Sequence, residues 1–266
     1  MKPLALWPVQ ARRQLVGVFT DIDDTLTTEG VATGEALGGL AALRQAGLHV
    51  IAITGRPVGW SEPFAREWPV DAIVAENGAV ALVQVPREQQ LRKLYQQDEA
   101  LRHANYARMQ QIARRIVEQV PGALLARDSA GRETDIAIDH SEYTTLPPAC
   151  IAQVVKLMQD QGMNATVSSI HINGWLGDHN KLAGARWIVR ELFGRELDAE
   201  IDRWVYVGDS TNDMLMFEHF PNSVGVANIR RFEADLKHPP RYITASERGA
   251  GFAELAAAIL QSRIGR

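Results

Sequence analysis

Short apolar runs alternate with helical patterns in this 266-residue chain, and this alternation constrains its fold more than any other feature. The runs at 16–23, 49–54 and 72–75 predict buried strands, and leucines at helical spacing predict a helix over 34–46. A further helix is expected over 58–68. Strands that alternate with helices favour right-handed crossovers and a parallel sheet.

The same alternation returns after residue 180. We expect helices at 181–193, 211–217 and 251–261, and strands at 204–207, 223–227 and 242–244.

The middle of the chain follows a different order, a helix and then two strands, twice over. The predicted elements are helices at 98–120 and 147–161, a strand pair at 123–127 and 133–139, and a second pair at 164–168 and 170–176. The sequence therefore predicts an α/β fold. A Rossmann-like parallel-sheet core, residues 1–83 and 180–266, holds an inserted α+β (αββαββ) cap domain, residues 84–179.

Composition excludes several classes of function. The net charge is −4, and Lys and Arg are spread along the chain, so no basic surface is expected for nucleic acid. The single Cys150 excludes an internal disulfide and a Cys-rich metal site. No apolar run is long enough to cross a bilayer, and the apolar patch at residues 4–7 is too short for a signal peptide. A cytoplasmic protein without membrane or nucleic-acid partners is expected.

Polar groups stand at the ends of the predicted strands. Asp21 and Asp23 end the first strand, Thr54 ends the second, and Asp209 and Asp213 follow the strand at 204–207. In an open parallel sheet, ligands bind beyond the carboxyl ends of the strands. Lys181 opens the preceding helix and adds a cation. These groups are expected to converge on one site.

This set of side chains suits phosphoryl transfer. A phosphate monoester carries two negative charges, so a carboxylate that attacks it needs compensating charge from Mg²⁺ and Lys181. Thr54 and backbone amides can hold phosphoryl oxygens. A calcium loop of the EF-hand type is excluded, because Leu26 and Ala32 occupy the positions that need Gly and Glu.

The motifs also resemble a known family. Asp21-x-Asp23-x-Thr25, Ile53-Thr54-Gly55-Arg56, Lys181 and Gly208-Asp209-x-x-Asn212-Asp213 resemble, in order, the four motifs of the haloacid dehalogenase (HAD) superfamily of phosphatases. The place of the insertion is similar to the C2B-capped subfamily IIB. That branch includes sucrose-phosphate phosphatase, mannosyl-3-phosphoglycerate phosphatase, Cof-type sugar phosphatases and eukaryotic phosphomannomutase. Asp24 departs from the pattern, since many relatives carry Gly there.

The resemblance implies a role for each motif residue. Asp21 would be the nucleophile that forms an aspartyl phosphate, and Asp23 would protonate the leaving oxygen and later deprotonate water. Phosphate binding would fall to Thr54, Gly55, Lys181 and Asn212, with Asn212 orienting either Lys181 or phosphate. Mg²⁺ would be held by Asp21, Asp23 through its main-chain carbonyl, Asp209 and Asp213.

Four further residues are candidates for substrate contact, and each has a structural alternative. Arg56 could contact substrate or Asp carboxylates, or pair on the surface. Asn77 could bind substrate or stabilise the turn that leads to the cap. Arg132 and His171 could face the site from the cap, although a solvated or structural role is the commoner fate of such residues.

We therefore expect a Mg²⁺-dependent phosphatase acting on a small phosphorylated metabolite, a sugar or polyol phosphate, because a closing cap leaves room only for a small substrate. One alternative is a phosphomutase, which returns the phosphoryl group to the sugar. Another is a non-catalytic sugar-phosphate sensor, although the presence of both Asp21 and Asp23 speaks against it. The protein is expected to be a monomer or homodimer.

Overall fold

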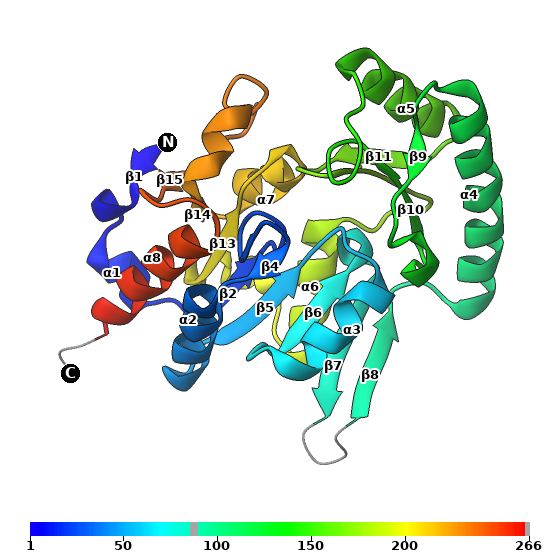
Figure 1. Ribbon diagram of the computed structural model, residues 1–266. Helices are drawn as coiled ribbons and strands as arrows, with labels where there is room; N and C mark the ends of the chain where they lie inside the picture. Colours follow the sequence, from blue (N-terminus) through cyan, green and yellow to red (C-terminus); the bar gives the residue numbers. More distant parts are fainter. Residues whose placement is uncertain (86–89, 264–266) are drawn as a thin grey trace.

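The computed structural model describes residues 1–85 and 90–263 (Figure 1). Among these residues, nine strands form one sheet in the order β1-β15-β14-β13-β2-β5-β6-β7-β8. In this order, every pair of neighbouring strands from β1 as far as β6 is parallel. β7 pairs antiparallel with β6, and β8 pairs antiparallel with β7 at the edge of the sheet. The strands are β1 (Lys2–Pro3), β2 (Gly17–Thr20), β5 (His49–Ile53), β6 (Ala72–Ala75), β7 (Val80–Val85), β8 (Gln90–Tyr95), β13 (Trp204–Gly208), β14 (Asn222–Gly225) and β15 (Tyr242–Ile243).

Helices cover both faces of this first sheet. Successive strand residues point to opposite faces. Val18 of β2 therefore packs in the apolar cluster shared with α2, α3 and α8, whereas Phe19 packs in the cluster shared with α6 and α7. This burial on two sides confirms the predicted α/β core. The helices around this sheet are α1 (Val9–Arg13), α2 (Gly34–Gln45), α3 (Val58–Glu67), α6 (Lys181–Phe193), α7 (Met214–His219) and α8 (Arg248–Gln261).

A second, antiparallel sheet has the order β11-β12-β10-β9 and lies beside the first (green in Figure 1). Ile136 and Ile138 pack against apolar residues of α4 and α5, so both helices cover one face. The neighbouring strand positions Asp135 and Asp139 are also buried, on the other face. The elements are α4 (Glu99–Gln119), β9 (Leu124–Leu125), β10 (Asp135–Asp139), α5 (Pro148–Asp160), β11 (Asn164–Val167) and β12 (His171–Trp175).

The first sheet extends beyond residue 83, where the sequence places the start of the inserted domain. β7 turns back against β6, and β8 pairs with β7 as far as Tyr95. The physical reason is the position of β8 at the edge of the sheet. Its polar residues alternate with apolar ones and leave it partly exposed, so it lacks the continuous apolar run of a central strand.

A short hairpin, β3 (Thr27–Thr28) and β4 (Val31–Ala32), follows β2 and was not anticipated from the sequence. Within residues 1–85 and 90–263, no helix combines the length and the apolar character that crossing a membrane requires.

Candidate active site

Three neighbouring strands bring the predicted residues together. β13, β2 and β5 lie side by side and run parallel, so their carboxyl ends share one edge of the sheet. Asp21 follows β2, and its backbone N–H donates to the carbonyl of Val207 in β13 (2.9 Å). Thr54 follows β5 and is fully buried. Lys181 is the first residue of α6, whose N-cap Asn180 accepts a hydrogen bond from the backbone of the first turn.

Lys181 lies between two of the predicted carboxylates. Its Nζ donates to Asp21 Oδ1 and to Asp213 Oδ1, both at 2.7 Å, and the side chain is 3% exposed. Burial disfavours the ammonium, but Asp21 and Asp213 together raise the pKa of Lys181 above its usual value. Burial, with help from Asp213 and Asp23, raises the pKa of Asp21, and Lys181 opposes this effect. Three ionisable groups are thus held together in a buried position.

Asp213 organises the turn after β13. Its Oδ2 accepts the backbone N–H groups of Asp209 (3.0 Å) and Ser210 (3.3 Å), and the hydroxyl of Tyr206 donates to its Oδ1. Gly208 is required here, because a Cβ at this position would lie 2.3 Å from Asp213 Oδ2. The sequence predicts Asp213 but misses Tyr206, which reads as one more apolar residue in a buried strand.

Asp209 carries the feature that best fits a cation. Its Oδ2 accepts from Asn228 (3.1 Å) and Arg231 (3.0 Å), whereas its buried Oδ1 has no hydrogen-bond partner within the described part of the chain. Asp21, Asp209 and Asp213 each place a carboxylate oxygen within 4.8 Å of the others. Burial, followed by these two neighbouring carboxylates, raises the pKa of Asp209 well above its ordinary value.

Three hard oxygen donors, one of them unused, are suited to a divalent cation such as Mg²⁺. A bound cation would also relieve the repulsion that raises these pKa values. The residues present therefore fit the expected metal. The carboxylate of Asp23 stands apart from this cluster.

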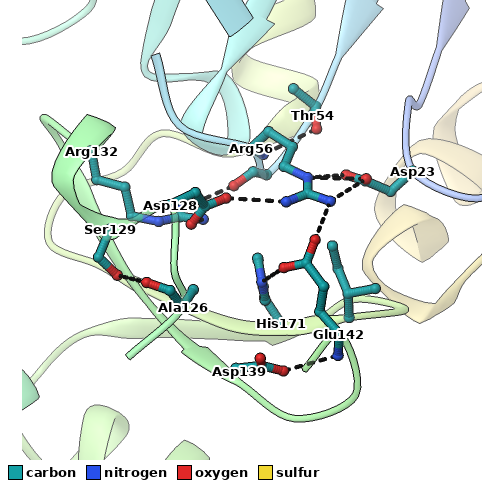
Figure 2. Close-up of polar contacts among 12 residues, drawn as sticks. Asp23, Thr54, Arg56, Ala126, Asp128, Ser129, Arg132, Asp139, Glu142 and His171 are labelled. Carbon is teal, nitrogen blue, oxygen red and sulfur yellow. Dashed lines mark hydrogen bonds and ion pairs between the residues drawn. The ribbon is translucent and has the colours of Figure 1, made fainter. Parts of the chain in front are cut away.

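Asp23 is bound by Arg56 instead (Figure 2). Arg56 Nε donates to both carboxylate oxygens of Asp23 at 3.0 Å, and Nη2 donates to Oδ1 at 2.9 Å. Thr54 Oγ1 accepts the backbone N–H of Arg56 (3.0 Å), which fixes the turn after β5. The sequence leaves open whether Arg56 contacts substrate or Asp carboxylates, or pairs on the surface. The structure shows contact with an Asp carboxylate, and Arg56 does not lie on the surface, because it is only 5% exposed.

The second sheet reaches the same turn from the opposite side. Arg132 Nη1 and Asn173 Nδ2 donate to the carbonyl of Gly55, at 3.0 and 3.2 Å. Arg132 is also paired with both oxygens of Asp135 at 2.8 Å, so its charge is already balanced. The Nε2 of His171 lies 2.8 Å from Glu142 Oε2. Both predicted residues face the core, but both are engaged by protein groups.

Asn77 lies in a strained turn after β6. Glu76, Asn77 and Gly78 all have positive φ (50°, 55° and 108°), a conformation that is costly for the first two. The Glu76 carboxylate compensates by accepting backbone N–H groups from Val58, Glu133 and Thr134. Asn77 is 3% exposed, and its Nδ2 has no partner in residues 1–85 and 90–263. An unused donor on a strained, buried side chain is consistent with a binding role.

Space for a substrate lies on both sides of the charged groups. A gap of about 10 Å³ is lined by Asp21, Asp23, Gly55 and Asn212. A cavity of about 470 Å³ opens beside Asn77, Lys181 and Asn212, and another of about 330 Å³ opens beside Asp23 and Arg56. Among the described residues, Asn212 makes no hydrogen bond to Lys181. Its Oδ1 accepts from Ser210 Oγ (2.9 Å), and the adjacent Asp213 takes the lysine.

Five residues with a place in this arrangement were missed from the sequence: Tyr206, Asn228, Arg231, Asp128 and Glu142. Asn228 and Arg231 come from the turn after β14, and the last two come from loops of the second sheet. No local pattern distinguishes the last four from solvated polar residues. Only the strand-end rule could have pointed to Asn228, since β14 lies next to β13.

Comparison with solved structures shows the same fold in several proteins. A protein from Thermoplasma acidophilum is 15% identical, with a TM-score of 0.68 over 92% of this chain and 99% of its own. The sucrose-phosphatase of Synechocystis, solved with sucrose and phosphate, is 18% identical, with a TM-score of 0.65 over 93% of this chain and 98% of its own. A sugar phosphatase of HAD subclass IIB is 16% identical, with a TM-score of 0.61 over 94% of this chain and 98% of its own.

Sequence comparison gives the family. No curated protein matches the sequence. The sequence model of the haloacid dehalogenase-like hydrolases matches residues 18–169, more than half of the chain. This range begins within β2, includes Asp21, Asp23 and Thr54, and ends in the second sheet. The predicted resemblance is confirmed, and the chain belongs to the haloacid dehalogenase-like hydrolases.

Proposed function

We propose that this protein is a Mg²⁺-dependent phosphatase that hydrolyses the phosphate monoester of a small metabolite, a sugar or polyol phosphate. One observation carries the proposal: buried Lys181 binds Asp21 and Asp213, and these two carboxylates cluster with that of Asp209, whose Oδ1 has no hydrogen-bond partner among the described residues. A buried cation beside an acidic cluster suits a dianionic phosphoryl group together with a metal. The fold shared with a sucrose-phosphatase and a subclass IIB sugar phosphatase supports the class of substrate.

Hydrolysis would proceed in two displacements. A carboxylate oxygen of Asp21 attacks phosphorus, the bond from phosphorus to the ester oxygen breaks, and Asp23 gives its proton to the departing oxygen. Water then attacks phosphorus of the aspartyl phosphate. Asp23 takes the proton from that water, the bond to Asp21 breaks, and inorganic phosphate leaves. Both carboxylates return to their starting state.

The remaining site residues would hold the phosphoryl group. The ammonium of Lys181, the hydroxyl of Thr54, the amide of Asn212 and the backbone N–H of Gly55 are donors that can face its oxygens. When bound by Asp21, Asp209 and Asp213, Mg²⁺ supplies positive charge that screens the two reacting anions from each other. The narrow gap between core and second sheet limits water around them, which strengthens every electrostatic contact.

In this proposal the second sheet and its helices, residues 99–175, form the cap. Arg132 and Asn173 reach the Gly55 carbonyl from the cap, so the cap closes directly over the turn that binds phosphate. A cap in contact with this turn leaves only the flanking cavities for the alcohol part of the substrate. This geometry favours a small leaving group over a folded protein.

The test is phosphate release from a panel of sugar, polyol and nucleoside monophosphates, with Mg²⁺ and with EDTA. We expect Mg²⁺-dependent release from a few sugar or polyol phosphates. Asp21→Asn should abolish release and keep the wild-type circular dichroism spectrum. Release in EDTA, or turnover by Asp21→Asn near the wild-type rate, would contradict the proposal. Isomerised hexose phosphate without free phosphate would identify a mutase instead.

A further inference from the structure

Arg56 binds three carboxylates that come from different parts of the fold (Figure 2). Its Nε and Nη2 hold Asp23 in the core, as described above. From the side of the second sheet, Glu142 Oε1 accepts from Nη2 at 2.8 Å, and Asp128 Oδ2 accepts from Nη1 at 3.2 Å. The guanidinium is a rigid planar fork, so all three contacts depend on one orientation.

The two carboxylates on the second-sheet side are themselves fixed. Asp139 accepts the backbone N–H groups of Glu142 (2.9 Å) and Tyr143 (3.0 Å), which shapes the loop after β10. The other oxygen of Glu142 is bound by His171. Burial alone would raise the pKa of Glu142, but His171 and Arg56 hold it at about 2, so the group is ionised at neutral pH.

Asp128 is held in a similar way. Its second oxygen accepts from Arg132 Nη2 at 3.1 Å, and Arg132 is clamped by Asp135. In the core, by contrast, the guanidinium has Asp23 as its hydrogen-bonding partner and the Trp60 ring, 4.8 Å from its centre, as its support. Two of the five hydrogen bonds that orient the guanidinium therefore come from the side of the second sheet, and they are the only ones that tie it to residues outside the core in the described part of the chain.

We propose that Glu142 and Asp128 are positioning residues that orient Arg56, which in turn holds the carboxylate of Asp23 in place for proton transfer. In this view, Asp23 is fully oriented for proton transfer only when the second sheet is docked on the core. When the second sheet moves away from the core, Arg56 loses two of its three carboxylate partners. The orientation of its guanidinium, which holds Asp23, is then less restrained. The inference rests on the proposed function, because it assumes that Asp23 protonates the leaving oxygen.

A purely structural role predicts a different outcome. If Glu142 and Asp128 only hold the two sheets together, their loss affects all substrates alike. If they position Asp23, their loss matters only where the leaving oxygen needs a proton. An alkyl phosphate has this need, whereas p-nitrophenyl phosphate releases an anion that is stable without one.

The experiment measures kcat/KM for the best alkyl phosphate of the panel and for p-nitrophenyl phosphate, in wild-type protein and in Glu142→Gln and Asp128→Asn. The ratio kcat/KM covers only the steps through departure of the leaving group, so the later role of Asp23 does not enter. For each variant we expect a loss of roughly tenfold with the alkyl ester, below the ~10²–10⁴-fold effect of losing an acid altogether. With the aryl ester the change should stay within about twofold, since no proton is needed.

Glu133→Gln is the matched control. Glu133 also joins the two sheets, because it accepts from Lys93 Nζ (2.9 Å) and Tyr95 Oη (2.7 Å) of β8, but it does not touch Arg56. This variant should change both esters by the same factor. Arg56→Lys, which keeps the charge but loses the fork, should repeat the selective loss with the alkyl ester.

Equal losses with both esters in Glu142→Gln and Asp128→Asn would overturn the positioning role and leave the proposed function intact. Wild-type protein that hydrolyses neither ester would refute the proposed function and the inference with it. Melting curves of each variant establish that the comparison is made on folded protein, and the two independent variants guard against one that fails to fold.

Discussion

Acidification from pH 7 to pH 5 should destabilise the protein through His179. This residue lies in the connection from β12 to α6 and is 4% exposed. Both ring nitrogens lack a hydrogen-bond partner in the described ranges, and the ring stacks on Trp175 with centroids 5.6 Å apart. Burial lowers the pKa of His179 to about 4, although the nearby Asp178 opposes the shift. The folded protein therefore keeps this imidazole neutral.

The magnitude follows from proton linkage. In the unfolded chain the ring titrates at its ordinary pKa of 6.5, against about 4 in the folded state. Between these values the unfolded state binds a proton that the native state does not, so stability falls as pH falls. Between pH 6.5 and pH 5 this linkage acts over about 1.5 pH units, and each unit lowers the free energy of unfolding by ~1.4 kcal/mol. The free energy of unfolding at pH 5 is therefore lower by about 2 kcal/mol.

The assay is urea unfolding at pH 7 and at pH 5. Wild-type protein should lose about 2 kcal/mol more than His179→Leu, which has no titrating ring. His103 is exposed on α4, so His103→Leu serves as the control and should behave like the wild type. If His179→Leu and the wild type lose the same free energy on acidification, the argument from burial is refuted.

Three further predictions concern the site. Gly78→Ala should lower the free energy of unfolding by more than about 3 kcal/mol, because φ is 108° and the new Cβ would lie 2.3 Å from the carbonyl oxygen of Asn180. Urea unfolding tests this, and a smaller loss would contradict it. Asp209→Asn should abolish the rise in melting temperature that Mg²⁺ gives the wild type, and an unchanged rise would exclude Asp209 as a ligand. Tyr206→Phe should cost about 1–3 kcal/mol of stability, because Asp213 loses a buried donor; equal midpoints in urea would argue against this contact.

The central strands and their helices could be predicted from the sequence because their residues are buried on both faces. β6 at Ala72–Ala75 and α6 at Lys181–Phe193 lie where apolar runs and helical spacing place them. The edges could not be predicted. β1 is two residues long, and β8 is half polar, so neither gives a pattern that differs from a loop.

The same distinction holds at the site. Asp21, Thr54 and Asp209 follow buried strands, and the strand-end rule is enough to gather them. Two of the carboxylate partners of Arg56, Asp128 and Glu142, come from loops of the second sheet. Their approach depends on how the two sheets dock, which no local pattern encodes. In the turn after β13, a short 3-10 helix decides that Asp213 rather than Asn212 faces Lys181.

The position of β2 has a consequence for synthesis of the chain. β2 lies between β5 and β13, so one of its edges stays unpaired until residues 204–208 have left the ribosome. At typical translation speeds of about 5–20 residues per second, the nascent protein waits roughly 10–40 s with an apolar strand edge open.

During this interval the second sheet, whose strands pair with one another within residues 124–175, has already been synthesised. The strand that carries Phe19, by contrast, offers an edge to any other strand, including that of another nascent chain. This order of elements therefore leaves the nascent chain open to pairing with a wrong strand until β13 has been made.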